Sequence, residues 1–195
     1  MCAARALLKA GASALLSWGT CGALDPRLVA GDLILPQTVC DDNGMHLVTD
    51  ASWRAQLVAA LPQRLQPASQ ACLLSGDRLV TTAEDKAASF NTAVAVDMES
   101  AALAREAQAA GLPFIAVRVV VDSARRRLPQ LALDTVDDIG RPRAGAFLSA
   151  ALKRPWQLLE LPALGRDFRK ATATLTAIAA CASAALAFGA AGRAS

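Results

Sequence analysis

The sequence predicts an α/β protein, a three-layer α/β/α sandwich around a mixed, largely parallel sheet. Two observations predict it. Apolar runs of strand length alternate with amphipathic helical patterns along the chain. These runs are continuously hydrophobic, as expected of strands that are covered on both faces. The length of 195 residues suits one domain. In such folds ligands bind beyond the carboxyl ends of the strands, so polar residues at those ends are the candidate functional residues.

The expected elements follow from periodicity and from the residues that end each run. In chain order they are a helix at 1–11, strands at 14–18 and 32–39, a helix at 52–66, strands at 71–74 and 94–98, a helix at 99–110, a strand at 114–121, and helices at 142–153 and from 166 onward.

The elements of the first half are bounded by glycine and proline. Leu7 and Leu8 lie on the inner face of the first helix, and Gly11 ends it. The strand at 14–18 runs into a glycine-rich sequence that starts at Gly19, and the turn at Asp25-Pro26 introduces the strand at 32–39. The run at 71–74 ends in a polar turn.

The elements of the second half have sharper boundaries. The helix at 99–110 begins directly after a strand, Gly111 is placed to cap its C-terminus, and Pro113 follows. The strand at 114–121 is nearly all aliphatic, which predicts a central, fully covered strand.

The chain is expected to divide into a domain at 1–165 and an alanine-rich helix at 166–195. Residues 171–192 carry no charge, and an uncharged run of about 20 residues is nominally long enough to span a membrane. However, Leu175, Ile178, Ala182 and Leu186 form one helical stripe. This pattern favours a helix that packs on the domain or lies at a membrane surface over one that spans the bilayer.

Composition excludes several classes of function. The chain has 20 basic and 17 acidic residues, a net charge of +3, and no dense basic face of the kind that binds nucleic acid. Its five cysteines are widely spaced without a C-x-x-C motif, which argues against a disulfide framework and a structural zinc site and favours a reducing, cytoplasmic compartment. His46, the single histidine, is expected to be exposed in a loop, and no metal site is predicted.

Two carboxylates directly follow aliphatic runs. Glu99 stands at a helix N-terminus, where the helix dipole favours the ionised form. Asp122 follows the strand at 114–121, and an apolar wall beside it would raise its pKa, so that it could hold a proton to donate. From the pattern alone, structural roles explain these two positions better than catalysis does. Glu99 would be the first residue of a helix, and Asp122 an ordinary turn residue.

Four motifs, which occur in order and at compatible spacing, favour catalytic over structural roles for these two residues. They are Gly19-Thr20-Cys21-Gly22-Ala23-Leu24 with Gly31-Asp32, then Ser75-Gly76-Asp77, then Val96-Asp97-Met98-Glu99-Ser100-Ala101-Ala102, and finally Val117-Arg118 through Asp122. Together they resemble the nucleoside phosphorylase superfamily, and especially its nucleosidase branch that hydrolyses methylthioadenosine and adenosylhomocysteine. The resemblance covers roughly residues 5 to 125.

The resemblance implies roles for these residues. Asp122 would protonate N7 of adenine, so that the base departs neutral, and Glu99 would accept hydrogen bonds from the ribose hydroxyls. Met98 would pack on the sugar, Leu79 and Val80 would flank the base, and Arg118 would orient the site. The residues expected to bind substrate are Thr20, Cys21, Gly22, Leu79, Val80, Val96, Met98 and Arg118.

The resemblance leaves the attacking group open. Phosphorylases of this superfamily place an arginine three residues before the Ser/Thr of the glycine-rich loop, and that position is Ser17 here. Water is therefore the favoured co-substrate, with phosphate as the alternative, and no cofactor is expected. Hydrolases of the family begin with a strand that carries a water-activating Glu, so we expect the N-terminal part of the family domain to lie outside this chain. An inactive subunit or scaffold is a further alternative.

The remainder of the chain, particularly Leu128-Pro129 to Gly140-Arg141 and the helix with Arg166-Asp167-Phe168-Arg169, resembles the hopanoid-associated members, which release adenine from adenosylhopane. This resemblance implies a nucleoside substrate that carries a hopanoid lipid, and peripheral contact with the inner membrane. Family members are commonly dimers or hexamers, so a homo-oligomer is expected, and no nucleic-acid partner is.

Overall fold

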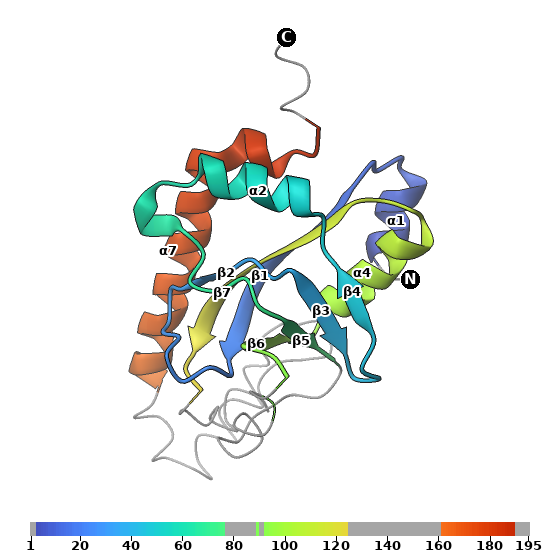
Figure 1. Ribbon diagram of the computed structural model, residues 1–195. Coiled ribbons are helices and arrows are strands. Elements are labelled where there is room, and N and C mark those ends of the chain that lie inside the picture. The colour runs from blue at the N-terminus through green and yellow to red at the C-terminus, as the bar shows by residue number, and fades with distance from the viewer. Residues whose placement is uncertain (1–2, 77–88, 90–91, 125–160, 190–195) are drawn as a thin grey trace, which may run out of the picture.

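A mixed sheet, with seven strands in the described residues, forms the centre of the protein (Figure 1). The computed structural model describes residues 3–76, 89, 92–124 and 161–189. The strand order is β2-β7-β1-β6-β5-β3-β4. The strands are β1 (Leu15–Ala23), β2 (Leu33–Ile34), β3 (Thr38–Asp41), β4 (His46–Val48), β5 (Leu73–Ser75), β6 (Ala95–Asp97) and β7 (Phe114–Asp122).

The long strands β1 and β7 form the middle of the sheet. They are parallel and in register from the Leu15–Phe114 pair to the Gly22–Asp122 pair, with a register shift between Cys21 and Gly22. The β3–β5 and β5–β6 pairs are also parallel, whereas the β1–β6, β2–β7 and β3–β4 pairs are antiparallel. The strands β1 and β7 therefore run in one direction and end together, whereas β6, β5 and β3 run in the opposite direction.

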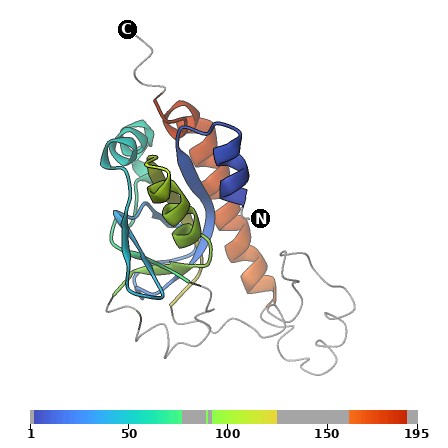
Figure 2. The same ribbon diagram turned by 90° about the vertical axis from the view of Figure 1, so that its right-hand side faces the viewer.

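Helices cover both faces of this sheet, which gives three layers (Figure 2). On one face, α4 (Ser100–Ala109) packs on alternate residues of β7, among them Phe114, Ala116 and Val120, and α1 (Ala3–Lys9) packs against α4. On the other face, α2 (Ala51–Ala60) and α7 (Leu161–Leu186) pack on Ile115, Val117 and Val119. The expected α/β sandwich with a mixed sheet is therefore confirmed.

Most predicted elements are present, with shifted boundaries. The first strand continues to Ala23, through the glycine-rich sequence that was expected to be a loop. The predicted strand at 32–39 is two short strands, because Pro36 between them has no N–H to donate to a ladder. Strand β4 lies where an exposed loop was expected. The predicted helix at 142–153 lies outside the described residues.

The predicted helix at 52–66 ends early. Asp50 caps α2, accepting a hydrogen bond of 2.7 Å from the backbone N–H of Trp53. The helix stops at Ala60 because Leu61 is extended, the conformation that a following proline favours, and Gln63–Leu65 form a separate 3-10 turn.

Helix α7 packs along β7 with the predicted stripe. Ile178 and Ala182 are buried, and Leu175 and Leu186 pack beside them. Trp53 of α2 donates a hydrogen bond to the carbonyl of Ala185 at 2.9 Å. Within the described part of the chain, no helix is both long and apolar enough to cross a bilayer. The division at residue 165 stays a prediction, and α7 begins before it, at Leu161.

Two of the cysteines are paired, although their wide spacing argued against a disulfide framework. Cys40 of β3 and Cys72, just before β5, form a disulfide across neighbouring parallel strands. Their separation of 32 residues hid the pair from sequence reasoning, because only the β3–β5 pairing brings them together. Cys21 and Cys181 are free thiols.

The turn after β1 holds a pH-sensitive ion pair. Asp25 accepts hydrogen bonds from the Arg27 guanidinium at 2.7 to 3.1 Å and from the Arg27 backbone N–H at 2.9 Å. These bonds, the side-chain ones first, lower the pKa of Asp25 below its usual value.

This pair predicts a defined pH dependence of stability. Because the folded pKa of Asp25 lies below the unfolded value of about 3.9, its contribution is complete above that value and is lost as pH falls through the folded pKa. The melting-temperature difference between wild type and Asp25→Asn should be constant near neutrality and shrink in acid. A difference that grows on acidification would contradict the assignment.

Candidate active site

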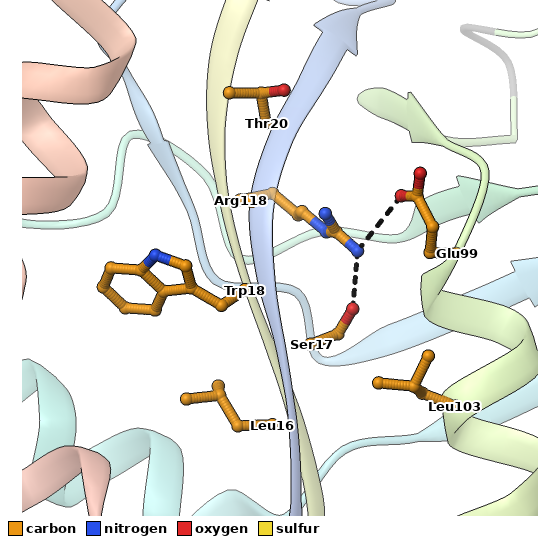
Figure 3. Close-up of a pocket in the computed structure, with 8 residues that line it drawn as sticks. Leu16, Ser17, Trp18, Thr20, Glu99, Leu103 and Arg118 are labelled. Carbon is orange, nitrogen blue, oxygen red and sulfur yellow. Dashed lines mark hydrogen bonds and ion pairs between the residues drawn. The ribbon is translucent and has the colours of Figure 1, made fainter. Parts of the chain in front are cut away.

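Glu99 stands where β6 turns into helix α4. It is the N-cap residue of α4, with φ −122° and ψ −27°, and its side chain makes no capping hydrogen bond. The carboxylate is instead 65% exposed and lies 3.5 Å from Nη2 of Arg118 (Figure 3). A carboxylate held in this way at a helix N-terminus can accept hydrogen bonds from a bound molecule.

Arg118 interrupts the aliphatic run of strand β7, which ends at Asp122, and it is buried. Its Nε lies 2.6 Å from Oδ2 of Asp97, whose side chain is 1% exposed. Its Nη2 donates to the hydroxyls of Ser17 and Ser100 at 2.5 and 3.0 Å. The guanidinium therefore ties β7 to β1 and to the start of α4.

Asp97 and Ser75 fix the β6–α4 turn. Asp97 accepts hydrogen bonds from the hydroxyl of Ser100 at 2.5 Å and from its backbone N–H at 3.2 Å. The backbone N–H of Ala101 donates to the Ser75 hydroxyl at 2.8 Å. The first N–H groups of α4 are thereby satisfied, and Glu99 is held in place between Asp97 and α4.

A cavity of about 480 Å³ lies beside Glu99 and Arg118, a size typical of small-molecule sites. Its lining residues are Leu16, Ser17, Trp18, Gly19, Thr20, Glu99, Leu103 and Arg118. In Figure 3, Ser17, Arg118, Glu99 and Leu103 lie on one side of β1, and Leu16 and Trp18 on the other. The lining therefore combines the polar or charged Ser17, Thr20, Glu99 and Arg118 with apolar residues.

The cavity follows an edge of β1. This strand pairs with β7 along most of its length, but with β6 only at Gly22 and Ala23. Among the strands of the described chain, none pairs with the other edge of β1 before Gly22. The cavity lies along this open edge, and both Thr20 and Glu99 line it.

Asp122 is buried at the end of β7, four residues beyond Arg118. It is in register with Gly22, and a Cβ at Gly22 would lie 2.9 Å from Oδ1 of Asp122. The missing side chain at position 22 therefore makes room for the carboxyl group. Asp122 is not part of the cavity lining, but its register partner Gly22 is two residues beyond Thr20, which lines the cavity.

The other residues that were predicted to bind substrate differ in exposure. Met98 is exposed beside Glu99, whereas Val96 is buried in a small apolar cluster with Leu24. Leu79 and Val80 lie outside the described residues.

Cys21 belongs to the main core, so a substrate contact from this position would come from its backbone. Burial strongly raises the pKa of its thiol above the usual value, while Arg118 partly opposes the shift. The thiol therefore stays protonated and cannot act as a nucleophile.

Thiol labelling tests this assignment. Iodoacetamide at mildly alkaline pH should modify the exposed Cys181 of the native protein and leave Cys21 unmodified until the chain is denatured. Peptide mass spectrometry distinguishes the two positions. Rapid labelling of Cys21 in the folded protein would contradict the buried, protonated thiol.

Sequence reasoning missed the partners of Arg118. Asp97 was seen as part of a motif, and Ser17 as the place where an arginine was lacking, but neither was predicted to bind Arg118. A signal was present, because a lone arginine within a continuous aliphatic strand must have a buried acidic partner. Asp97, at the end of another buried strand, was the nearest candidate.

Comparison with known proteins identifies similar sequences and folds. Residues 1–153 match the phosphorylase superfamily. A 5′-methylthioadenosine/S-adenosylhomocysteine nucleosidase of Staphylococcus saprophyticus is 30% identical over 129 residues, which are 56% of this chain and 57% of the relative. The chain thus spans little more than half the length of the curated relative that it matches.

Solved structures share the fold at lower identity. The S-adenosylhomocysteine nucleosidase of Streptococcus pyogenes, in complex with 5-methylthiotubericidin, has a TM-score of 0.56 and 24% identity, covering 63% of this chain and 60% of that one. A futalosine hydrolase mutant of Helicobacter pylori has a TM-score of 0.59 and 20% identity, covering 77% of this chain and 73% of that one.

Proposed function

Because the chain belongs to the phosphorylase superfamily, we propose that it cleaves the N-glycosidic bond of an adenine nucleoside and releases adenine. The observation that carries this proposal is the cluster of Glu99 and the buried Arg118–Asp97 pair at one cavity, with Asp122 at the end of the strand that supplies Arg118. An exposed carboxylate beside a cavity can bind sugar hydroxyls, and a buried carboxyl group can hold a proton.

In this proposal the two carboxyl groups divide the chemistry. Asp122 donates a proton to N7 of adenine as the bond to the sugar breaks, so the base leaves neutral. Glu99 accepts hydrogen bonds from the ribose hydroxyls and stabilises the positive charge that develops on the sugar ring. Arg118 is a positioning residue, since its hydrogen bonds hold Ser17 and the β6–α4 turn.

We further propose water rather than phosphate as the attacking group. A phosphate dianion needs unmatched guanidinium charge, whereas the Arg118 charge is matched by Asp97 at 2.6 Å. Ser17 occupies the position at which the resemblance places a phosphate-binding arginine in phosphorylases. In hydrolysis the water oxygen bonds to C1′ of the sugar as the C1′–N9 bond breaks, and adenine leaves with the proton from Asp122. The proton that the water loses restores the acid form of Asp122, so the cycle balances.

Apolar groups beside Glu99 support a nucleoside with an apolar 5′ group. Leu103 lines the cavity on the same side of β1 as Glu99, and Met98 is exposed next to Glu99 in the chain. Methylthioadenosine and the larger adenosylhopane both carry such a group, and we propose the hopanoid nucleoside as the specific substrate.

Free adenine is the product to measure. The protein is incubated separately with methylthioadenosine, adenosylhomocysteine and adenosylhopane, with and without phosphate, and adenine and sugar products are separated by chromatography. Adenine with a free sugar supports hydrolysis, and a sugar 1-phosphate formed only with phosphate would replace it by phosphorolysis. No adenine from any substrate under either condition would reject the proposal and leave a subunit or scaffold role.

A further inference from the structure

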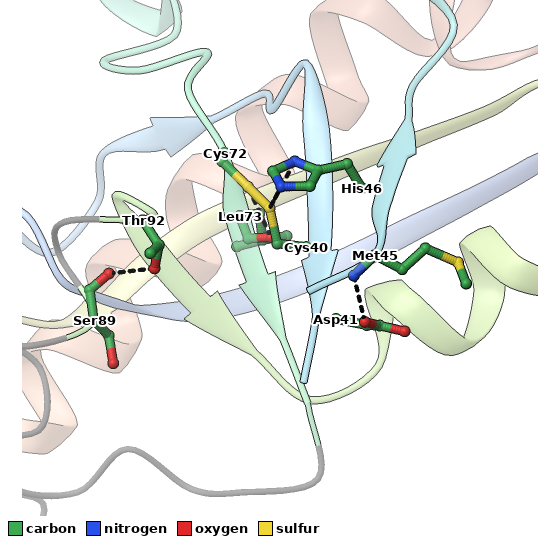
Figure 4. Close-up of a disulfide and its surroundings, with 8 residues drawn as sticks. All are labelled: Cys40, Asp41, Met45, His46, Cys72, Leu73, Ser89 and Thr92. Atoms are coloured by element: carbon green, nitrogen blue, oxygen red, sulfur yellow. Dashed lines mark hydrogen bonds between the residues drawn. A yellow bond between two sulfur atoms is a disulfide. The ribbon is translucent and has the colours of Figure 1, made fainter. Parts of the chain in front are cut away.

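A second cluster of reactive side chains lies at the β3–β4 edge of the sheet (Figure 4), whereas the cavity follows β1. It consists of the disulfide-bonded Cys40 and Cys72 together with His46. Their ligand atoms all lie within 4.8 Å of one another, and Sγ of Cys40 is 3.2 Å from Nδ1 of His46. No residue that lines the cavity belongs to this cluster.

We propose that Cys40, His46 and Cys72, once the disulfide is reduced, bind one thiophilic divalent cation, with zinc as the best match. Two thiolates and an imidazole are the ligand types that zinc prefers, and three protein ligands leave a fourth position for water. The exposed His46 and the half-buried Cys72 give solvent access to that position.

The spacing suits such a site. Two ligands of a tetrahedral zinc with bonds of about 2.3 Å lie about 3.7 Å apart, within the 4.8 Å that encloses these atoms. The two sulfurs must separate once their bond is broken. Their side chains can make this change by rotation, while the strands stay paired.

The backbone holds the three residues in place before any ion binds. Cys40 and His46 are directly paired across β3 and β4, and the pairing of Val39 with Leu73 places Cys72 beside them. The β3–β4 turn is fixed by Asp41, which accepts hydrogen bonds of 2.9 Å from the backbone N–H groups of Asn43 and Met45. This rigidity reduces the ordering cost of binding.

Reduction of the Cys40–Cys72 disulfide requires a reductant, and a dithiol can supply it. The dithiol supplies two electrons and two protons, which convert the disulfide to two thiols, and the dithiol becomes a disulfide itself. Binding of the cation then releases both thiol protons, and neutral His46 supplies a ring nitrogen. Oxidised protein has no thiolate at this position and should not bind the ion.

Cobalt(II) provides a spectroscopic probe. The full chain is reduced with dithiothreitol, desalted without oxygen and titrated with cobalt(II), and zinc is then added. Reduced wild type should bind one equivalent with a sulfur-to-cobalt charge-transfer band and intense visible bands of tetrahedral cobalt, which zinc abolishes. Oxidised wild type should show neither band.

Variants assign the ligands. Cys72→Ser should lose the charge-transfer intensity of one sulfur, and His46→Asn should weaken zinc binding at least about tenfold, or about 1.4 kcal/mol. Cys181→Ser, a control for exposed thiols, should behave like wild type. Circular dichroism verifies that each variant is folded, and Cys40 is left intact because its side chain is buried.

Two results would overturn the proposal. One is reduced, folded wild type that binds no cobalt with a sulfur band. The other is a sulfur band that persists unchanged in Cys72→Ser but disappears in Cys181→Ser.

Discussion

Replacing Asp122 with Asn should reduce the rate of adenine release by about 10²- to 10⁴-fold, because an amide cannot donate the proton that N7 requires. The substitution keeps the size of the side chain, and the Gly22 position still leaves room for it. Steady-state kinetics on the substrate found in the adenine assay measures the effect. The loss should fall mainly on kcat, since the proton transfer occurs in the transition state.

The matched control is Glu106→Gln, the same change from carboxyl to amide at a distant position of α4. Glu106 pairs with Arg5 at 2.8 Å and does not line the cavity, so this variant should keep wild-type kinetics. Equal activity of wild type and Asp122→Asn would exclude Asp122 as the acid.

Gly22→Ala tests the same carboxyl group without altering it. The new Cβ would stand 2.9 Å from Oδ1 of Asp122, closer than real Cβ contacts allow, so the carboxyl group must move. A displaced acid should lower kcat by about 10²-fold, the effect of a misplacement of about 1 Å. Gly165→Ala, where a Cβ meets nothing, is the control and should leave the rate unchanged.

Replacing Arg118 with Met should destabilise the fold by about 3–5 kcal/mol, the largest loss of stability expected here. The variant leaves Asp97, with a side chain only 1% exposed, without its partner at 2.6 Å, and the desolvated charge is then uncompensated. Urea unfolding followed by circular dichroism measures the change.

Two comparisons identify the cause of that loss. The double variant Arg118→Met with Asp97→Asn should recover part of the stability, because the unpaired charge is removed. Arg5→Met, in a pair where Arg5 is 65% exposed, should cost less than about 1 kcal/mol. A loss of that small size for Arg118→Met would mean that the buried pair contributes little.

The local elements of the fold were predictable from the sequence. Continuous apolar runs predicted β7 and β6, and the polar residues that end these runs drew attention to Glu99 and Asp122. Breaks in the elements were harder to predict. Pro36 divides one expected strand, and Leu61 before Pro62 ends a helix early.

The sequence by itself determined the alternation of strands and helices and the carboxylates at the strand ends, because these depend on neighbouring residues and on side-chain periodicity. Only the tertiary structure decided that Arg118 meets Asp97 and that Cys40 meets Cys72 beside His46. The physical reason is that these contacts depend on sheet order and register. The order β7-β1-β6-β5-β3 differs from the order of the strands in the chain, and no local pattern specifies it.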